Sequence, residues 1–111
     1  MKVYLPDIVG DGEAIVYTYL KRNGFEVKIH PSPDYHEAGF PDLVAEKDGQ
    51  KIFIEVKNGD SNASWHQNQM DWLASHPDTN YFIAVTKIIN RIPGGTEIVF
   101  YKVILEENAF V

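Results

Sequence analysis

Two acids and an amine occupy what the sequence indicates are adjoining strands of a small core. Residues 51–57, KIFIEVK, alternate as a strand does, so Glu55 and Lys57 would share one face, about 7 Å apart. Residues 42–46 form a second expected strand that begins with Asp42. A hairpin turn at Lys47-Asp48-Gly49 would join the strands and bring Asp42 near Glu55.

This combination of side chains suits a divalent metal site. Two carboxylates in a low-dielectric site repel each other, so one takes up a proton unless a cation lies between them. Carboxylate oxygens are the ligands that Mg²⁺ and Mn²⁺ prefer. Lys57 beside these acids would help to hold, or to deprotonate, a water molecule poised for attack.

A third carboxylate is expected from a helix. Residues 11–22 predict a helix, in which Glu13 shares one stripe with the apolar positions Val16, Tyr17 and Leu20. Glu13 is therefore expected on the face that packs on the sheet rather than on the solvated face. A first-turn acid favoured by the helix dipole is the alternative interpretation.

A second helix contributes an amide. Residues 65–75 predict a helix in which Gln69 falls between Trp72 and Leu73 on one apolar arc. A buried amide without a partner would cost roughly 1–3 kcal/mol, so Gln69 should have one. Lys57 or the attacking water is the natural candidate.

These elements together predict an α/β domain. The expected order is a helix, three strands, a helix and two strands, with the last strand at a sheet edge. We expect a mixed sheet with one helix on each side. The expected strands cover residues 25–29, 42–46, 51–57, 81–87 and 96–105.

Size and composition agree with one soluble domain spanning residues 1–111. The hydrophobic content of 44% and charged content of 23% are those of a globular protein. The chain has no cysteine, which excludes disulfides and thiolate metal sites. No apolar stretch approaches the roughly 20 residues that span a bilayer, and the start lacks the pattern of a secretory signal. We expect an intracellular, cytoplasmic protein without a membrane partner.

The order of these motifs resembles a known group of enzymes. The chain is similar to the PD-(D/E)XK nuclease superfamily, and most similar to its minimal VRR-Nuc and archaeal Holliday junction resolvase-like branches. The resemblance implies a restriction-endonuclease-like core and runs from about Gly12 to Lys87. The motifs that carry it are Glu13, Pro41-Asp42, Glu55-Val56-Lys57 and Gln69 followed by Trp72-Leu73.

The resemblance implies a metal site. In such families the strand acids, here Asp42 and Glu55, bind Mg²⁺ or Mn²⁺ together with a main-chain carbonyl, here that of Val56. The helix glutamate, here Glu13, completes the site or lies just outside it. The implied reaction is hydrolysis of a phosphodiester bond, in which the metal activates water and neutralises charge on the phosphate.

The resemblance also implies roles for the amine and the amide. Lys57 would activate or orient water, and Gln69 would orient the lysine or the water. The implied partner is DNA, cut by an endonuclease that works as a homodimer.

Two features depart from the resolvase pattern. The net charge is −6, whereas proteins that bind nucleic acid usually carry a basic surface. The loop before Asp42 holds His30 and His36 where resolvases often have an arginine, and we assign His30 no role. Junctions, flaps, single strands, duplexes and RNA stay open as substrates. The alternative is a non-catalytic protein of this fold, acting as an assembly subunit or an acidic inhibitor.

Overall fold

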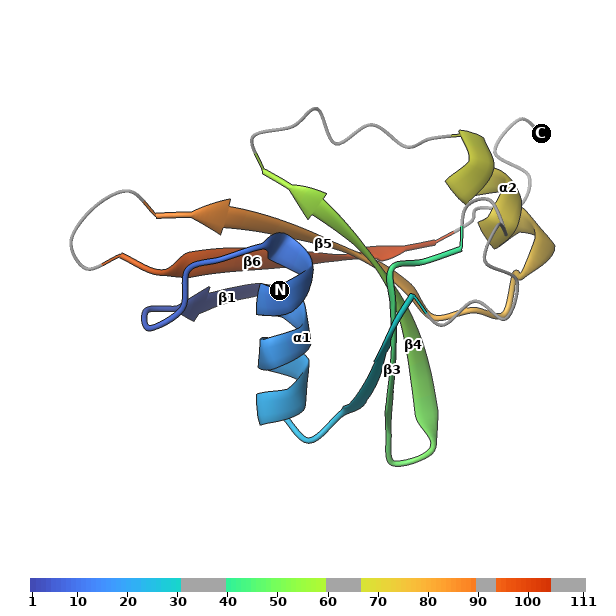
Figure 1. The fold of residues 1–111 in the computed structure, drawn as a ribbon. Coiled ribbons are helices and arrows are strands. Elements are labelled where there is room, and N and C mark those ends of the chain that lie inside the picture. The colour runs from blue at the N-terminus through green and yellow to red at the C-terminus, as the bar shows by residue number, and fades with distance from the viewer. Residues whose placement is uncertain (31–39, 60–66, 90–93, 105–111) are drawn as a thin grey trace.

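The computed structural model of the chain describes residues 1–30, 40–59, 67–89 and 94–104. In these residues six strands form one sheet in the spatial order β1-β6-β5-β4-β3-β2, with two helices beside it (Figure 1). The elements in chain order are β1 (Lys2–Leu5), α1 (Gly12–Arg22), β2 (Glu26–Ile29), β3 (Leu43–Lys47), β4 (Gln50–Asn58), α2 (Gln67–Ser75), β5 (Tyr81–Ile88) and β6 (Thr96–Val103).

The sheet is mixed, as the sequence predicts. Strands β4 and β5 are parallel, and every other neighbouring pair is antiparallel. The β3–β4 hairpin is confirmed: Lys47 pairs with Gln50, and the two residues between them, Asp48 and Gly49, have φ values of 53° and 78°. Positive φ at both positions matches the type I′ turn that suits the twist of a hairpin.

One expectation about the sheet is wrong. The strand expected over residues 96–105 was placed at a sheet edge. The corresponding strand, β6, instead lies between β5 and β1. Strand β1, which the sequence did not predict, pairs with β6 from Lys2–Val99 to Leu5–Thr96. A four-residue strand carries little periodic signal, and its partner is more than 90 residues away in the chain, so only the tertiary contact defines it.

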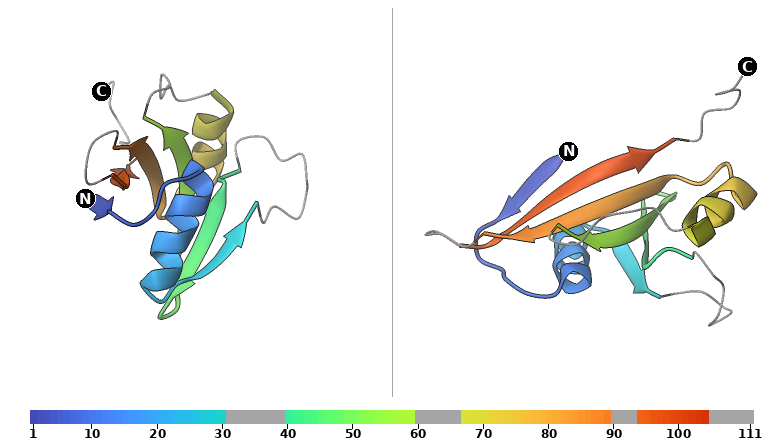
Figure 2. Two further views of the ribbon diagram at one scale, coloured as in Figure 1. Left: turned by 60° about the vertical axis from the view of Figure 1, so that its left-hand side comes forward. Right: turned by 90° about the horizontal axis from the view of Figure 1, so that it is seen from above.

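The two helices pack on side chains from opposite faces of the twisted sheet, and α2 lies near one end of it (Figure 2). Because side chains alternate along a strand, Ile54 points toward α1 while its neighbour Phe53 points away from it. The core on the α1 side consists of Leu5, Ile15, Val16, Leu20, Leu43, Ala45, Ile54, Ala84 and Ile98. The smaller core on the other face joins Trp72 and Leu73 of α2 to Tyr81, with Phe40, Phe53, Ile83 and Val103 packed around them.

Strands β3 and β4 separate at one end, and this separation positions the site. Their ladder stops at the pair Leu43–Ile54. Strand β4 continues to Asn58, where, among the strands that the structure describes, its partner is β5. The backbone of β4 beyond Ile54 therefore faces a gap on its β3 side, at the level of Asp42.

The helix boundaries differ little from expectation. Helix α1 begins at Gly12, and Asp11 takes the N-cap position without a side-chain hydrogen bond. Helix α2 begins at Gln67, and the predicted start at residue 65 lies outside the described residues. Neither described helix is long and apolar enough to cross a membrane.

Helix α1 approaches the sheet closely at its first residue. A Cβ atom at Gly12 would lie 2.7 Å from Thr86 Oγ1 and 3.2 Å from Val56 Cγ1. Both neighbours are β-branched side chains on strands, which have little freedom to move aside. The glycine therefore seats the N-terminus of α1, with Glu13, against the gap between β3 and β4.

We predict that Gly12→Ala lowers the free energy of unfolding by about 1–2 kcal/mol, because it overpacks this contact. Gly10→Ala is the matched control, since its nearest neighbour would be Ile15 Cδ1 at 3.9 Å. Urea denaturation of both variants measures the effect. Equal stability of the two variants would show that the close approach does not constrain α1.

Candidate active site

Asp42 is held by the backbone of the neighbouring strand. The N–H of Val56 donates a hydrogen bond of 2.9 Å to Asp42 Oδ2. This bond occurs where the β3–β4 ladder has ended, so the carboxylate takes the place of a strand partner. The N–H and C=O of a strand residue lie on the same side of the strand, so the Val56 carbonyl also faces the gap. Asp42 and the Val56 carbonyl thus meet at the gap, and their role as metal ligands stays a prediction.

Glu55 is a buried acid beside Asp42. Its side chain is only 9% exposed. Burial, followed by the charge and close contact of the Asp42 carboxyl, raises the pKa of Glu55 to about 8, and Lys57 only partly offsets this. The Oε2 atom is buried and accepts no hydrogen bond within the described part of the chain. At neutral pH this acid therefore keeps a proton unless a cation in addition to Lys57 compensates its charge.

Lys57 lies next to Glu55 on the same strand. Its Nζ atom is 3.9 Å from Glu55 Oε1, and its side chain is 14% exposed. This distance is at the outer limit of an ion pair and too long for a hydrogen bond. The ammonium is thus near the acids without being fully engaged by Glu55.

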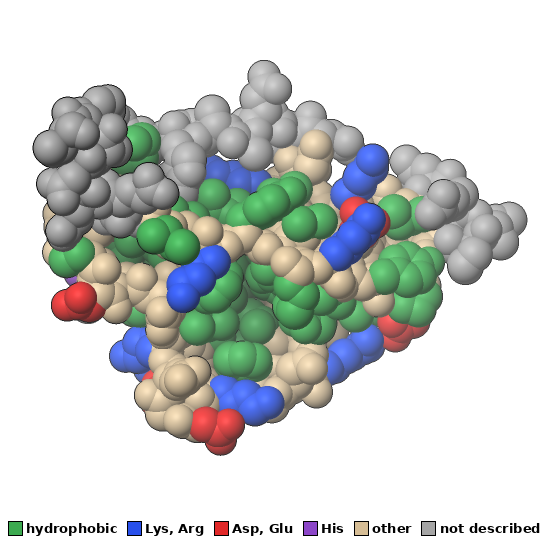
Figure 3. All heavy atoms as spheres, turned by 180° about the vertical axis from the view of Figure 1, so that it is seen from behind, with side chains coloured by type: hydrophobic (Ala, Val, Ile, Leu, Met, Phe, Trp, Pro, Cys, Tyr) green, Lys and Arg blue, Asp and Glu red, His purple; other side chains and the backbone are tan. Residues whose placement is uncertain are grey.

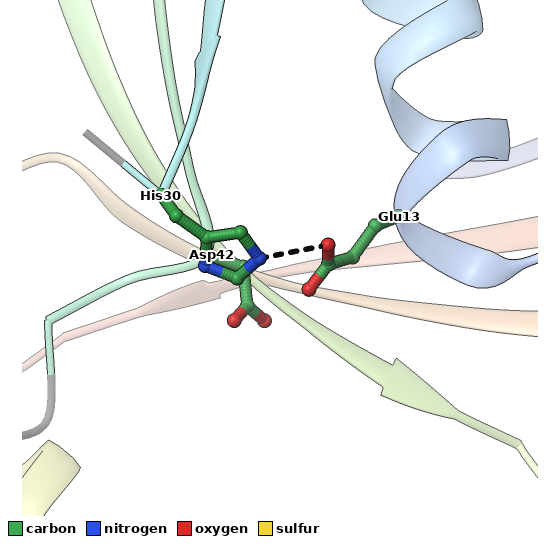
Figure 4. Close-up of side chains that lie close together, drawn as sticks. All are labelled: Glu13, His30 and Asp42. Carbon is green, nitrogen blue, oxygen red and sulfur yellow. Dashed lines mark hydrogen bonds and ion pairs between the residues drawn. The ribbon is translucent and has the colours of Figure 1, made fainter.

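Glu13 reaches the same region from α1. Its Oε2 atom lies 3.0 Å from His30 Nε2. Figure 4 shows Glu13, His30 and Asp42 directed toward one another from three different elements, and one potential ligand atom of each lies within 4.8 Å of the others. The Glu13 side chain is half-buried, with 31% of its surface exposed.

Gln69 and Tyr81 lie on the α2 side of the sheet. Gln69 is 7% exposed, so the predicted burial of this amide is confirmed. That it contacts Lys57 stays a prediction. Burial, together with the charges of Glu55 and Asp42, raises the pKa of Tyr81 well above its usual range. The Tyr81 hydroxyl is therefore neutral at any working pH.

His30 is the residue that sequence analysis missed. It directly follows β2, and its N–H donates a 2.8 Å hydrogen bond to the Asp42 carbonyl. A usable signal was present, because residues 25–29 and 42–46 were both expected to be strands. In an antiparallel pairing of these strands, the end of the first lies beside the start of the second, which brings His30 close to Asp42.

The fold and the gathered acids define a class of protein. A mixed sheet with helices on both faces, and acids at the gap between two strands, is the arrangement of a restriction-endonuclease-like fold. The family model described as AHJR-like, REase_AHJR-like, matches residues 13–95. The chain belongs to this family of restriction-endonuclease-like proteins, whose name denotes nucleases, hydrolases that act on nucleic acid. A search of curated proteins finds no match.

The raised pKa of Glu55 predicts how stability depends on pH in the metal-free protein. From about pH 4.5 to about pH 8 the folded state keeps a proton on Glu55 that the unfolded chain has lost. Stability therefore falls as pH rises through this window, by up to about 1.4 kcal/mol per pH unit, and levels off above it. Glu55→Gln, which stays neutral, should lose this part of the dependence.

Thermal unfolding of the wild type and of Glu55→Gln in EDTA, from about pH 6 to about pH 9, measures how the stability of each protein depends on pH. The wild type should lose stability relative to Glu55→Gln as pH approaches about 8. Parallel curves would mean that Glu55 is already ionised at neutral pH in the folded state.

Proposed function

We propose that the protein is a divalent-metal-dependent endonuclease that hydrolyses DNA phosphodiester bonds. The observation that carries this proposal is the Glu55 carboxylate, buried beside Asp42 with an Oε2 atom that no described residue satisfies. A buried acid with an acidic neighbour is unfavourable unless a proton or a cation compensates it. The AHJR-like family membership supports a nuclease rather than another use of such a site.

The residues present fit a divalent ion. Asp42, Glu55, Glu13 and the Val56 carbonyl would supply oxygen ligands, the donor type that Mg²⁺ and Mn²⁺ prefer. The hydrogen bond from the Val56 N–H fixes the Asp42 carboxylate and leaves its other oxygen available. A bound ion would supply positive charge to the scissile phosphate and lower the pKa of an attacking water.

Lys57 and Gln69 would orient or activate the attacking water. The ammonium of Lys57, 3.9 Å from Glu55, is close enough to the acids to donate a hydrogen bond to a water at their edge. Acceptance of a proton from this water would require the neutral amine form of Lys57, which has a lone pair. The buried amide of Gln69 would orient the lysine or the water. Both side chains are mostly buried, which restricts their rotamers and keeps the reacting groups aligned.

The acidic balance bears on the substrate. With a net charge of −6, binding to the phosphate backbone should be weak and strongly salt-dependent. Part of the negative charge belongs to the site, where a bound ion would neutralise it. Branched DNA, of the kind that resolvase-like nucleases cut, is the substrate class that we propose to compare first with linear duplex and single strands.

We further propose a homodimer that uses the sheet face opposite α1. By strand alternation Tyr4, Val85, Val99 and Tyr101 point to this side, and Tyr4 and Tyr101 are 45% and 55% exposed. Figure 3, which views the molecule from behind, displays apolar side chains gathered on this face with Lys and Arg side chains among and around them. Two copies packed through this face would provide two active sites, one for each strand of a DNA duplex.

We predict that Asp42→Asn, Glu55→Gln and Lys57→Ala each lower cleavage at least ~100-fold, because each removes a metal ligand or the group that handles water. Cleavage of supercoiled plasmid, single-stranded DNA and a synthetic four-way junction is followed with Mg²⁺, Mn²⁺ or EDTA. Calorimetric titration with Mn²⁺ should give weaker binding for the two acid variants and nearly unchanged binding for Lys57→Ala.

Two exposed residues of the same hairpin provide matched controls. Glu46 pairs with Lys51 near the turn, away from the gap, so Glu46→Gln and Lys51→Ala should cut like the wild type. Full cleavage by any of the three site variants would refute its assigned role. Metal binding without cleavage of any substrate would favour the non-catalytic alternative.

For the dimer, Tyr101→Glu should convert the protein to a monomer, because it places a charge in the apolar interface. Val9→Glu, also at an exposed apolar residue, lies before α1 and should leave the mass unchanged. Light scattering coupled to gel filtration measures the mass. A monomeric wild type would overturn the proposal.

A further inference from the structure

His30 brings a nitrogen donor to a group of acids. Its Nε2 atom is 3.0 Å from Glu13 Oε2. One ligand atom each of Glu13, His30 and Asp42 lie within 4.8 Å of one another (Figure 4). The three residues come from the end of β2, the start of α1 and the residue before β3. Chain segments far apart in the sequence thus converge on one point.

The backbone keeps His30 in place. Its φ of 48° lies in the left-handed region, which histidine visits more readily than most residues but still uncommonly. The 2.8 Å hydrogen bond from its N–H to the Asp42 carbonyl ties it to the start of β3. Its side chain is 61% exposed, so burial of the imidazole does not account for this conformation.

We propose that His30 binds the metal ion directly through Nε2, together with Glu13 and Asp42. This inference rests on the proposed metal-dependent function and deepens it. Imidazole is a good ligand for transition metals, whereas Mg²⁺ takes oxygen ligands almost alone. The ligand set of nitrogen and oxygen atoms therefore selects Mn²⁺ over Mg²⁺.

The spacing of the ligand atoms suits this role. An ion about 2.1 Å from each ligand in octahedral geometry holds adjacent ligands about 3 Å apart and opposite ligands about 4.2 Å apart. The 3.0 Å between His30 Nε2 and Glu13 Oε2 matches an adjacent pair. The widest separation, within 4.8 Å, closes with a small side-chain movement. On metal binding, the proton of a neutral His30 would reside on Nδ1.

A second role for His30 has to be distinguished from ligation. An imidazole that only donates a hydrogen bond to Glu13 would orient this acid without touching the ion. The two roles differ in whether the nitrogen is bonded to the metal. Pulsed electron paramagnetic resonance of bound Mn²⁺ reports this, because a directly bound imidazole produces a ¹⁴N modulation of the signal.

The test compares wild type with His30→Asn under Mn²⁺ loading. Asparagine tolerates the left-handed backbone, so it removes the imidazole, together with its contact to Glu13, without straining the chain. We expect the ¹⁴N modulation in the wild type and its loss in His30→Asn. Mn²⁺ affinity should fall at least ~10-fold, and Mg²⁺ affinity should change by less than about threefold.

His76→Asn is the control for loss of a histidine, since His76 stacks on Trp72 at the end of α2 and should leave the ¹⁴N modulation intact. Bound Mn²⁺ without ¹⁴N modulation, or with modulation that survives in His30→Asn, overturns ligation by His30 and leaves the proposed nuclease function standing. A wild-type protein that binds no Mn²⁺ overturns both.

Discussion

The close approach of Asp42 and Glu55 in a buried place is the constraint on which the site depends. Two like charges out of water oppose each other, and this opposition, added to burial, raises the pKa of Glu55 to about 8. The fold imposes this pairing, because Asp42 is tied to the Val56 N–H and Glu55 is fixed in β4. The site therefore favours any positive species that enters it, whether a proton or a cation.

The separation of β3 from β4 makes this arrangement possible. Had the ladder continued past Leu43–Ile54, the Val56 N–H and C=O would have been used within the sheet. Instead the strand edge stays open beside the acids, while β5 supports β4 from its other side as far as Asn58. Helix α1 closes the region from one face because Gly12 permits it to approach Thr86 and Val56. Asp42 and Glu55 are thus held by the strands themselves, which limits the reorganisation that a reaction would require.

Packed cores on both faces of the sheet support the site. On one face the larger core packs α1 on the sheet, and on the other a cluster of aromatic rings around Trp72 supports α2. Trp72 contacts Phe40, Phe53 and Tyr81 with centroid separations of 5.5, 5.6 and 5.9 Å. This cluster packs on the part of β4 that precedes Glu55, so it supports the site by holding that strand in place. The proposed dimer would cover the exposed rings of Tyr4 and Tyr101.

The sequence by itself determined the features that depend on local pattern: the two helices, the β3–β4 hairpin, and the shared face of Glu55 and Lys57. Alternation and turn chemistry act over a few residues, so they can be recognised without coordinates. The tertiary structure decided which distant segments meet. Strand β1 exists because it pairs with β6, and His30 joins Glu13 and Asp42 because β2 and β3 end at the same level. Such contacts arise from packing between segments far apart in the chain, which no local periodicity encodes.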